Sequence, residues 1–486
     1  MRVDVVPSFY QDSVVLMRVA ADLERRPGVR RAALFMGTPA NHGLLEQVGL
    51  ATEASRRARP EDLIVAVRAV TASDATSALA AGREALVARR RETERPGAAR
   101  PRTLEAALRA LPGANLAMIS VPGPYAGREA ARALARDLHV FLFSDNVPVA
   151  TEIELKRDAV ARGRLMMGPD CGTAYLDGVG LGFANVVPRG RIGLVAASGT
   201  GLQAVVCGIA ALGEGVSHAI GVGGRDLGAE VGGTMTRFAL EVLASDPATA
   251  AVVLVAKPPH ASVMPALRDA LANIGKPLVV CCLGARAGGP GTWVETLGDA
   301  ARAAVAVVNG RTWAPEPEGR VPVVAARPRG GRVLGLFTGG TLAHEASLVL
   351  ERALGRVAFD PADLGGEGHA VVDLGADRFT AGRAHPMIDT RLRTELIRAA
   401  VARDPRAVLL LDVVLGRGAH PDPAGAVVDA LGSARRDAVV VVAALIGTAG
   451  DPQGLAAQRA RLEAAGVHVF EGAAEAARFA ATLVAP

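Results

Sequence analysis

Short apolar runs alternate with longer stretches of mixed polarity along most of this sequence. Typical runs are IGLVAAS (192–198), AVVLVAKP (251–258) and VLGLFTGG (333–340), and each is followed by an amphipathic stretch. Buried strands that alternate with amphipathic helices are typical of parallel sheets with crossover helices. The pattern therefore predicts an α/β fold in which most sheets are parallel.

The length of the chain, 486 residues, is enough for three or four domains. An Arg-rich cluster at 88–102 and a Pro-rich stretch at 313–331 have the composition of solvated links between domains. We therefore expect blocks at 1–102, 103–189, 190–318 and 332–486. The last two blocks share an opening and a strand–helix rhythm, which predicts two copies of one flavodoxin-like domain.

Two of the expected strand-to-helix junctions carry small residues with hydroxyl groups. The first contains Ser198, Gly199, Thr200 and Gly201, and the second contains Thr338, Gly339, Gly340 and Thr341. A helix N-terminus has unpaired N–H groups and a partial positive charge, and glycine lets a ligand approach them. One such turn alone is more often a tight connection than a site. Two matching turns on two similar domains favour a shared anion site, with phosphate as the expected ligand.

A third glycine-rich stretch, GVGGRDLGAEVGG (221–233), follows another apolar run. At the carboxyl end of that strand, where open α/β sheets bind ligands, would lie Gly223, Gly224, Arg225 and Asp226. A surface ion pair is the structural alternative for this Arg–Asp pair. Lys257 ends a further apolar run and is a candidate for holding the anion. His385 is a candidate general acid or base, and the alternative is that it only helps to build a loop. Neither a Walker loop nor a GxGxxG fingerprint follows a strand.

Charge and cysteine content narrow the class of partner. The net charge of +5 does not indicate nucleic-acid binding, because the arginines are scattered among acidic residues. Cysteine occurs at 171, 207, 281 and 282 without CxxC spacing, so we expect reduced thiols in a cytoplasmic protein and no metal site. No uninterrupted apolar stretch is long enough for a membrane helix. The expected partner is therefore a small anionic substrate, rather than a nucleic acid or a membrane.

Several segments resemble the α subunit of succinyl-CoA synthetase in order and spacing. They are LMMGPDCGTA (165–174), RIGLVAASGTGLQ (191–203), GVGGRDLG (221–228), SDPATAAVVLVAKPP (245–259) and GKPLVVCCLG (275–284). VPVATEIELK (147–156) is similar to the segment between the two halves of its CoA-binding domain, and the block from VLGLFTGGTLAHE onward is similar to the carboxyl-terminal domain of the β subunit. The sequences GEGVSHAIGVGGRDL and GRAHPMID resemble those of the FdrA family of acyl-CoA synthetase-like proteins.

The resemblance implies a Rossmann-like CoA-binding domain at 103–189. AALFMGTPANHGLLEQ (32–47) would be its displaced first strand, so that 30–85 would complete the domain. The candidate CoA-binding residues implied in this way are Gly37, Thr38, Asn41, Asp170 and Cys171. Cys171 is also explained as a small residue packed in a tight loop. CoA is an open alternative as a ligand, and the sequence does not require a cofactor.

Differences from the synthetase bear on the reaction. In the synthetase the two glycine-rich helices hold a phosphate on a histidine, yet the stretch that follows KPLVVCCLG here contains no histidine. Lys257 stands near the point where the synthetase has a glutamate, and a cation there suits a free phosphate or carboxylate better than a phosphohistidine. We also find no ATP-grasp domain. The chain alone is therefore not expected to make acyl-CoA from ATP.

The FdrA resemblance implies a phosphate-dependent carbamoyl or acyl transferase subunit. Such a subunit would exchange a carbamoyl group between oxalurate and phosphate, giving oxamate and carbamoyl phosphate. Two alternatives stay open: an acyl-CoA ligase subunit that uses CoA and an ATP-grasp partner, and a non-catalytic CoA-binding scaffold. By analogy we expect a homodimer or a hetero-oligomer with other subunits.

Overall fold

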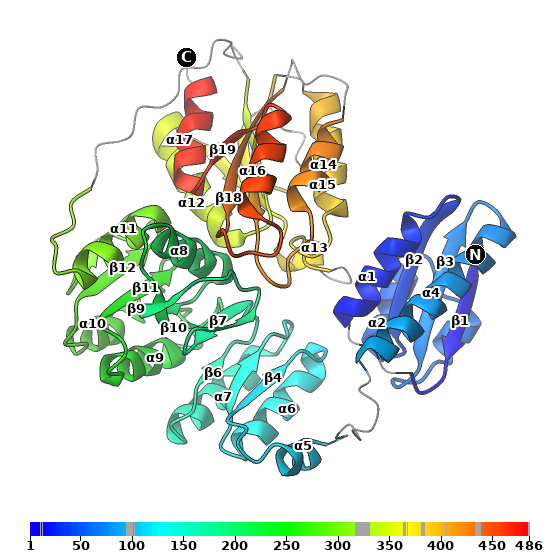
Figure 1. Cartoon of the computed structure of the whole chain (residues 1–486), viewed down its shortest axis with the longest axis horizontal. Coiled ribbons are helices and arrows are strands. Elements are labelled where there is room, and N and C mark those ends of the chain that lie inside the picture. Colours follow the sequence, from blue (N-terminus) through cyan, green and yellow to red (C-terminus); the bar gives the residue numbers. More distant parts are fainter. Residues whose placement is uncertain are drawn as a thin grey trace. The chain divides into compact units, whose positions relative to one another are not determined.

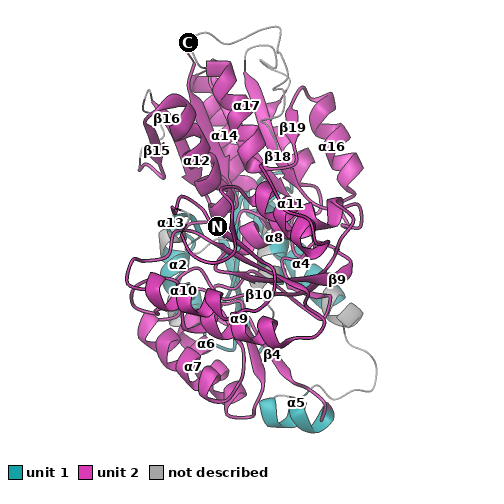
Figure 2. Cartoon of the chain, turned by 90° about the vertical axis from the view of Figure 1, so that its left-hand side faces the viewer, with its two compact units in different colours: residues 1–110, 377–385 teal, residues 111–376, 386–486 magenta. Residues whose placement is uncertain are grey.

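The computed structural model of this chain divides into two compact units, each described here by itself (Figure 2). Unit 1 contains residues 1–110 and 377–385, and unit 2 contains residues 111–376 and 386–486. The structure describes residues 1–9, 11, 13–93, 101, 103–286, 288–315, 331–362, 366, 368–380, 384–404, 406–432 and 439–484. No helix in those ranges is long and apolar enough to cross a membrane. The two predicted links lie largely outside them, although α4 (Ala72–Thr93) extends into the Arg-rich cluster.

Unit 1 is built on a three-stranded sheet in the order β1-β3-β2. Its strands are β1 (Arg2–Val6), β2 (Val29–Met36) and β3 (Leu63–Ala69), and its helices are α1 (Ser13–Glu24), α2 (Pro39–Gln47), α3 (Glu53–Arg56), α4, α5 (Leu104–Ala110) and α13 (Asp377–Thr380). Leu63 and Val65 of β3 pack in a core with α1 and α4, whereas Ile64 packs with Leu45 of α2. Because β3 is buried on both faces, its sequence is continuously apolar.

The pairing in unit 1 corrects two expectations. Both neighbours of β3 run antiparallel to it, whereas the apolar pattern predicted parallel sheets. In addition, β2 pairs with β3 and not with a strand of the 103–189 block. The expectation that 32–47 supplies the first strand of a CoA-binding domain, completed by 30–85, is therefore wrong for the sheet that forms.

Unit 2 begins with a small parallel sheet in the order β4-β5-β6 (Figure 1). Its strands are β4 (Leu116–Ile119), β5 (His139–Leu142) and β6 (Met166–Met167), and its crossover helices are α6 (Gly123–Leu134) and α7 (Val149–Ala161). The chain then leaves this sheet, because β7 (Thr173–Leu176) and β8 (Val179–Gly182) form an antiparallel hairpin on the edge of the next one. It changes sheets before residue 189, where we placed the end of the block.

Two larger sheets follow, and both have a flavodoxin-like strand order. The first contains β9 (Arg189–Ala196), α8 (Gly199–Ala211), β10 (Val216–Gly221), α9 (Thr234–Ser245), β11 (Ala251–Ala256), α10 (Met264–Ala272), β12 (Leu278–Cys282), β13 (Thr292–Trp293) and α11 (Leu297–Val308). Its order is β13-β12-β11-β9-β10-β7-β8, parallel from β13 to β10. With its β7–β8 edge, this region (173–308) is called the N-half.

The second large sheet repeats the same plan. It contains β14 (Val333–Phe337), α12 (Gly340–Leu354), β15 (Val357–Phe359), β16 (His369–Asp373), α14 (Arg391–Arg403), β17 (Val408–Val414), α15 (Pro423–Leu431), β18 (Val440–Ile446), α16 (Leu455–Ala464), β19 (His468–Phe470) and α17 (Ala473–Val484). Its order is β15-β16-β14-β17-β18-β19, parallel throughout. We call residues 333–376 and 386–484 the C-half. The predicted α/β fold, with two flavodoxin-like copies, is confirmed.

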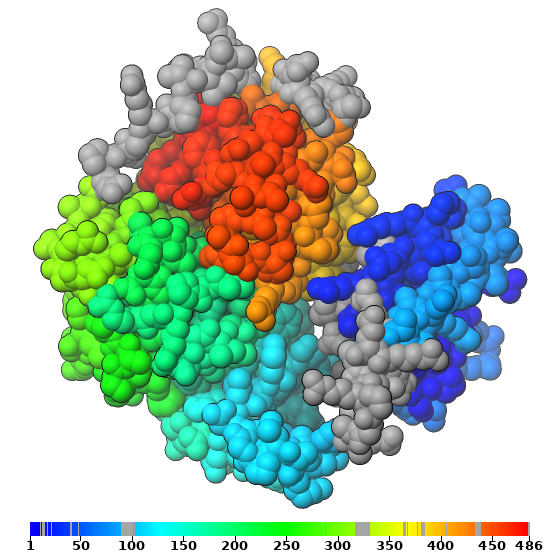
Figure 3. Space-filling model, in the orientation of Figure 1, coloured from blue at the N-terminus to red at the C-terminus, as the bar shows by residue number. Residues whose placement is uncertain are grey.

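The N-half and the C-half share one hydrophobic core. α8 packs with α11 on the N-half sheet, α12 packs with α17 on the C-half sheet, and α8 contacts α12 between them. Leu202, Ala300, Ala343 and Ala477 belong to the same buried cluster. Figure 3 shows the green surface of the N-half directly against the orange and red surface of the C-half. This core holds the beginnings of α8 and α12 in a fixed relation.

Buried polar contacts add to that core. The Leu297 N–H at the start of α11 donates to Oε1 of Glu345 on α12 at 2.7 Å, and burial raises the pKa of Glu345 to about 8. Asp451, after β18, accepts from Asn185 Nδ2 at 2.7 Å and from the Val186 N–H at 2.7 Å, both of which precede β9. These contacts hold the N-half against the C-half, and leaving their polar groups unpaired would cost folding free energy.

We predict that Asp451→Ala destabilises unit 2. The change leaves the buried donors of Asn185 and Thr448 and the partly buried N–H of Val186 without this acceptor, so the free energy of unfolding should fall by about 3 kcal/mol. Asp269→Ala, at an exposed position of α10, is the matched control and should change stability by less than about 0.5 kcal/mol. Urea unfolding followed by circular dichroism makes the comparison. Equal midpoints for the two variants would show that Asp451 is not a structural tie.

Candidate functional site

The two glycine-rich turns meet in the structure. Ser198 caps α8, where its Oγ accepts from the Gly201 N–H at 2.9 Å. The same hydroxyl donates to Oγ1 of Thr341, in the first turn of α12, at 2.6 Å. The N-termini of α8 and α12 therefore lie side by side, one supplied by each half.

Their close approach depends on glycine at two positions. A methyl group on Gly339 would lie 2.8 Å from the side chain of Thr200, and one on Gly201 would lie 2.9 Å from Cγ2 of Thr341. Both distances are shorter than ordinary van der Waals contact. Gly199 is different, because the nearest atom to an added methyl group is Thr173 Oγ1 at 3.7 Å. Gly201 and Gly339 therefore serve the packing of the two turns, whereas a methyl group on Gly199 would make only ordinary van der Waals contacts.

Only some of the expected N–H donors are available to a ligand. Asp412, on β17, accepts from the N–H groups of Thr338 and Gly339, each at 2.8 Å, and from Oγ1 of Thr338. The expectation that these two residues offer donors to an anion is therefore wrong. The N–H groups of Gly199, Thr200, Gly340 and Thr341 have no acceptor in the part of the chain that the structure describes. These four unpaired N–H groups belong to two adjacent positive helix ends.

Asp412 is itself a buried structural group. Nη1 of Arg393, on α14, donates to the carbonyl oxygen of Asp412 at 2.6 Å and to its Oδ1 at 3.2 Å. Burial raises the pKa of Asp412, although Arg393 and the Thr338 and Gly339 donors act in the opposite direction. Because its oxygens are already used by these donors, Asp412 shapes the turn and is not a free catalytic carboxylate.

Lys257 lies near the start of α12, together with two titratable groups. It follows β11 and is exposed. Burial lowers the pKa of His344, on α12, and the charge of Lys257 lowers it further. Burial raises the pKa of Asp373, the last residue of β16, to about 6, and here Lys257 acts in the opposite direction. The positive charge of Lys257 therefore acts on groups near the beginning of α12 and at the end of β16.

Arg225 and Asp226 belong to a different place in unit 2. Nζ of the fully buried Lys156, on α7, donates to Asp226 Oδ1 at 2.7 Å, to Glu152 Oε1 at 2.8 Å and to the Val222 carbonyl. Arg225 Nη2 lies 2.8 Å from Glu152 Oε2. The two predicted residues thus form one charge network with two residues of α7.

The network leaves Asp226 no capacity for a ligand. Its Oδ2 accepts from the N–H of Thr236 at 2.8 Å and from Oγ1 of Thr236 at 2.6 Å, and its Oδ1 also accepts from the N–H of Met235. Both residues lie in the first turn of α9. Asp226 therefore holds α9 and α7 together, and its assignment as a substrate-binding residue is corrected.

The predicted CoA-binding residues near 170 are explained by packing. Cys171 is buried with its Sγ 3.3 Å from the Gly221 carbonyl oxygen, and burial raises the pKa of its thiol to about 12. A methyl group on Gly223 would collide with the backbone of Pro169, so this glycine lets two loops pack. Asp170 and Gly224 are exposed. Cys171 is therefore a protonated, buried side chain and not an accessible group at the end of a CoA site.

The remaining predicted residues lie in unit 1. Thr38 caps α2 by accepting from the Asn41 N–H at 3.3 Å, and Asn41 Nδ2 donates to the Met36 carbonyl at 2.9 Å. Gly37 packs against the backbone of Arg59. These contacts account for all three residues without a cofactor. His385 is in the short segment of unit 1 that follows α13, and burial lowers its pKa to about 4, so it is uncharged near neutral pH.

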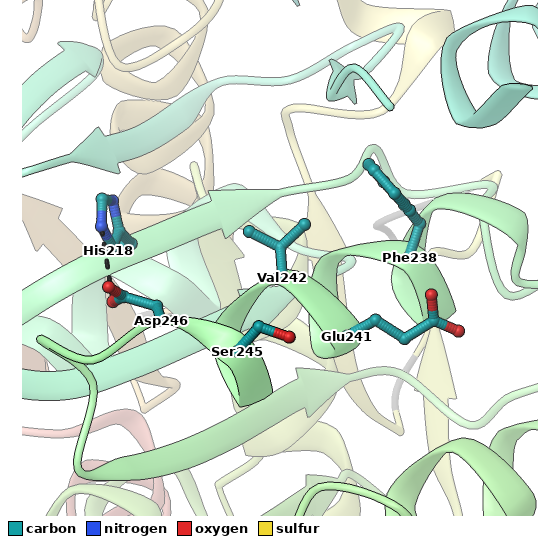
Figure 4. A pocket seen from close by; sticks show the side chains of 6 residues that line it. All are labelled: His218, Phe238, Glu241, Val242, Ser245 and Asp246. Carbon is teal, nitrogen blue, oxygen red and sulfur yellow. Dashed lines mark ion pairs between the residues drawn. The ribbon is translucent and has the colours of Figure 1, made fainter. Parts of the chain in front are cut away.

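An open depression of about 510 Å³ lies elsewhere on the N-half (Figure 4). Its lining residues are His218, Phe238, Glu241, Val242, Ser245 and Asp246. His218 Nδ1 accepts from the Asp177 N–H at 3.0 Å, and its Nε2 lies 3.6 Å from Asp246. His218 therefore holds the β7–β8 turn through Nδ1, and its Nε2 lies near the carboxylate at the end of α9. The depression contains none of the predicted site residues.

Sequence reasoning missed several charged residues of these clusters, Arg393 among them. Glu152 and Lys156 stand four residues apart on α7 and meet Asp226 across a long separation in sequence. Asp373 ends the apolar run of β16, and Asp412 interrupts that of β17. A lone carboxylate in an apolar run is a usable signal, because a buried charge needs partners.

The comparisons with known families divide the chain into two matched regions. Residues 1–102 match a family described as AllF, heavy metal-associated domain, and residues 336–483 match the CoA-ligase family. The Escherichia coli K12 protein YahF, described as uncharacterized, is 36% identical over 497 aligned positions, covering 96% of this chain and 95% of YahF.

More distant relatives match a smaller part of this chain or match it at a lower sequence identity. The α subunit of ADP-forming succinate–CoA ligase from Staphylococcus epidermidis is 29% identical over 171 positions, which cover 34% of this chain and 55% of that subunit. The chain therefore spans about half the length of that relative. A structure of dinucleotide-forming acetyl-coenzyme A synthetase 1 from Ca. Korarchaeum cryptofilum, in complex with phosphate and ADP, aligns with a TM-score of 0.33 and 14% identity, over 80% of this chain and 86% of that one.

The residues of the first matched region do not fit a heavy metal ion. Such ions favour thiolate ligands, and residues 1–102 contain no cysteine. Among the residues with described positions, no group of three or more His, Cys, Asp or Glu side chains could hold a metal. We therefore derive no function from a metal in unit 1.

We predict that Lys156→Met strongly destabilises unit 2. Removing the ammonium leaves the Glu152 and Asp226 carboxylates buried without their cation, which should lower the free energy of unfolding by about 3–5 kcal/mol. Arg157→Met, at the adjacent exposed position of α7, is the control and should have little effect. Thermal unfolding of both variants provides the measurement. If Lys156→Met unfolds at the wild-type temperature, the network does not join α7 to α9.

Proposed function

This chain belongs to the same family as the Escherichia coli protein YahF, and we propose that the N-termini of α8 and α12 together bind the phosphoryl group of a small acyl or carbamoyl phosphate. The observation that carries the proposal is the contact between Ser198 and Thr341, which joins two helix N-termini at one point. The four unpaired N–H groups beside that contact would be the phosphate donors.

Electrostatics supports an anion at this place. Each helix N-terminus carries about half a positive charge, so two that face each other repel unless a negative charge lies between them. Phosphate accepts hydrogen bonds from several N–H groups at once. Lys257 adds a full positive charge near the start of α12. An anion that bridges α8 and α12 would relieve this repulsion.

The FdrA resemblance supplies the proposed reaction. A phosphate oxygen would attack the carbamoyl carbon of oxalurate, the bond from that carbon to the oxamate nitrogen would break, and the nitrogen would take a proton. The products are carbamoyl phosphate and oxamate. The helix ends and Lys257 would orient phosphate and stabilise the charge that develops, with no covalent protein intermediate. The chain would work as a cytoplasmic transferase subunit, in a homodimer or with other subunits.

A second candidate is an acyl-CoA ligase subunit. The match of residues 336–483 to the CoA-ligase family favours it, as does the partial likeness to a succinate–CoA ligase α subunit. Against it, the stretch from β12 to α11 contains no histidine to carry a phosphate, and Cys171 is buried. A non-catalytic CoA-binding scaffold would keep the fold without this chemistry. CoA binding separates these two candidates from the transferase.

Calorimetry on the purified chain should detect carbamoyl phosphate and inorganic phosphate but not CoA. We predict that Gly199→Val lowers the affinity for both anions at least about tenfold, because the new side chain fits without a collision and occupies space beside the unpaired N–H groups. Gly199 is a cleaner test than Gly340, whose added methyl group would collide with the Asp373 carboxylate. Gly113→Val, where no atom lies within 4 Å of an added methyl group, is the matched control.

The outcomes separate the candidate functions. Anion binding that is lost in Gly199→Val and kept in Gly113→Val supports the shared site. Unchanged anion affinity in Gly199→Val rules out the α8 end as a donor. Tight CoA binding without anion binding favours the ligase or the scaffold.

We further predict that Lys257→Ala weakens phosphate binding by about fivefold, because an exposed cation contributes roughly 1 kcal/mol to an ionic contact. Lys257→Arg keeps the charge and should retain most of the affinity. Titration at low and at high salt provides the check, since added salt should reduce the difference between wild type and Lys257→Ala. If Lys257→Ala binds phosphate as wild type does, Lys257 is not part of the site.

A further inference from the structure

Asp373 lies against the first residue of α12. It is the last residue of β16, which pairs with β14 next to the turn at 338–341. A methyl group placed on Gly340 would collide with its Oδ2, so the carboxylate lies beside the Cα of Gly340. The only hydrogen bond described for its carboxylate is at Oδ1, which accepts from the Gly375 N–H at 2.9 Å. Oδ2 is an acceptor without a donor among the described residues.

The charges around Asp373 come from three neighbouring elements. Lys257, after β11, is the cation that acts on it; Asp360, after β15, and Asp412, on β17, are the anions. On α12 itself, His344 is the fifth residue, and the charge of Lys257 also lowers its pKa. Asp412 is paired with Arg393 and the turn donors, whereas Asp373 lies directly beside Gly340 at the start of α12.

A carboxylate in this position is unfavourable for a bare oxyanion and favourable for a hydrogen-bond donor. An ionised carboxyl group accepts hydrogen bonds and cannot donate them. Two anions brought together at a helix end repel, whereas an N–H group beside the phosphoryl group would form a charge-assisted hydrogen bond to Oδ2. We propose that Asp373 sets the ligand preference of the anion site, favouring phosphorylated ligands that carry an N–H donor and disfavouring anions that present oxygen alone. This inference rests on the function proposed above.

Carbamoyl phosphate and acetyl phosphate form a matched pair for the test. They differ by an NH₂ group in place of a CH₃ group, so only the first can donate to Asp373. Calorimetry on the wild-type chain should show at least about tenfold tighter binding of carbamoyl phosphate. In Asp373→Ala the ratio should fall to near one, mainly because acetyl phosphate binds more tightly. A ratio that is the same in wild type and Asp373→Ala overturns the inference.

A pH series gives a second measurement that does not depend on the ligand pair. Burial raises the pKa of Asp373 to about 6, so its carboxylate is ionised at neutral pH and protonated below that value. Sulfate, whose own charge is constant over this range, should bind more tightly as the pH falls from about 7.5 to about 5. Asp373→Asn should bind sulfate more tightly at neutral pH and remove most of this dependence. If Asp373→Asn keeps the dependence, the titrating group is another one, such as His344, and the inference fails.

Failure of the inference and failure of the proposed function look different. If the wild-type chain binds none of the three anions, both are wrong. If it binds them, and Gly199→Val abolishes that binding, the anion site stands whatever Asp373 does. A thermal midpoint for Asp373→Ala and Asp373→Asn within a few degrees of wild type confirms that a changed ratio is not a folding defect.

Discussion

Two helix ends of the same charge are held together by an apolar core, and the rest of unit 2 is arranged around that constraint. The buried cluster formed by α8, α11, α12 and α17 leaves the first turns of α8 and α12 no room to separate. Glycine at 201 and 339 removes the side chains that would keep them apart, and the hydrogen bond from Ser198 to Thr341 fixes their register. Hydrophobic burial thus stabilises an arrangement that helix electrostatics alone would oppose.

The N-half and the C-half use different acceptors for the N–H groups of the same strand-to-helix turn. In the N-half, a neutral hydroxyl group caps the helix, because Ser198 accepts from the Gly201 N–H. In the C-half, the buried carboxylate of Asp412 takes the Thr338 and Gly339 N–H groups, and Arg393 compensates its charge. The C-half also keeps Asp373 at the helix end. The two copies therefore share a fold, while the negative charge of the junction is concentrated on one side.

The apolar pattern was sufficient to predict the parallel, flavodoxin-like halves, because each buried strand is a separate apolar run followed by a helix. The two turns that meet were also identified, since their glycine and hydroxyl residues are local signals. Contacts between residues distant in sequence could not be predicted. The sequence around Arg225 and Asp226 does not distinguish a surface ion pair from contacts with Glu152 and the buried Lys156. Nor does an apolar run reveal strand direction, so the antiparallel sheet of unit 1 and the β7–β8 hairpin were missed.

Ser198 and Thr341 belong to one polypeptide, and that has a consequence for how the site responds to dilution. When two halves of a site come from separate subunits, the site disperses as the concentration falls below the dissociation constant of the assembly. When both halves are covalently joined and share a core, their effective local concentration is set by the fold and not by the solution. The paired helix ends of this chain are therefore complete within each molecule, even at concentrations where larger assemblies dissociate.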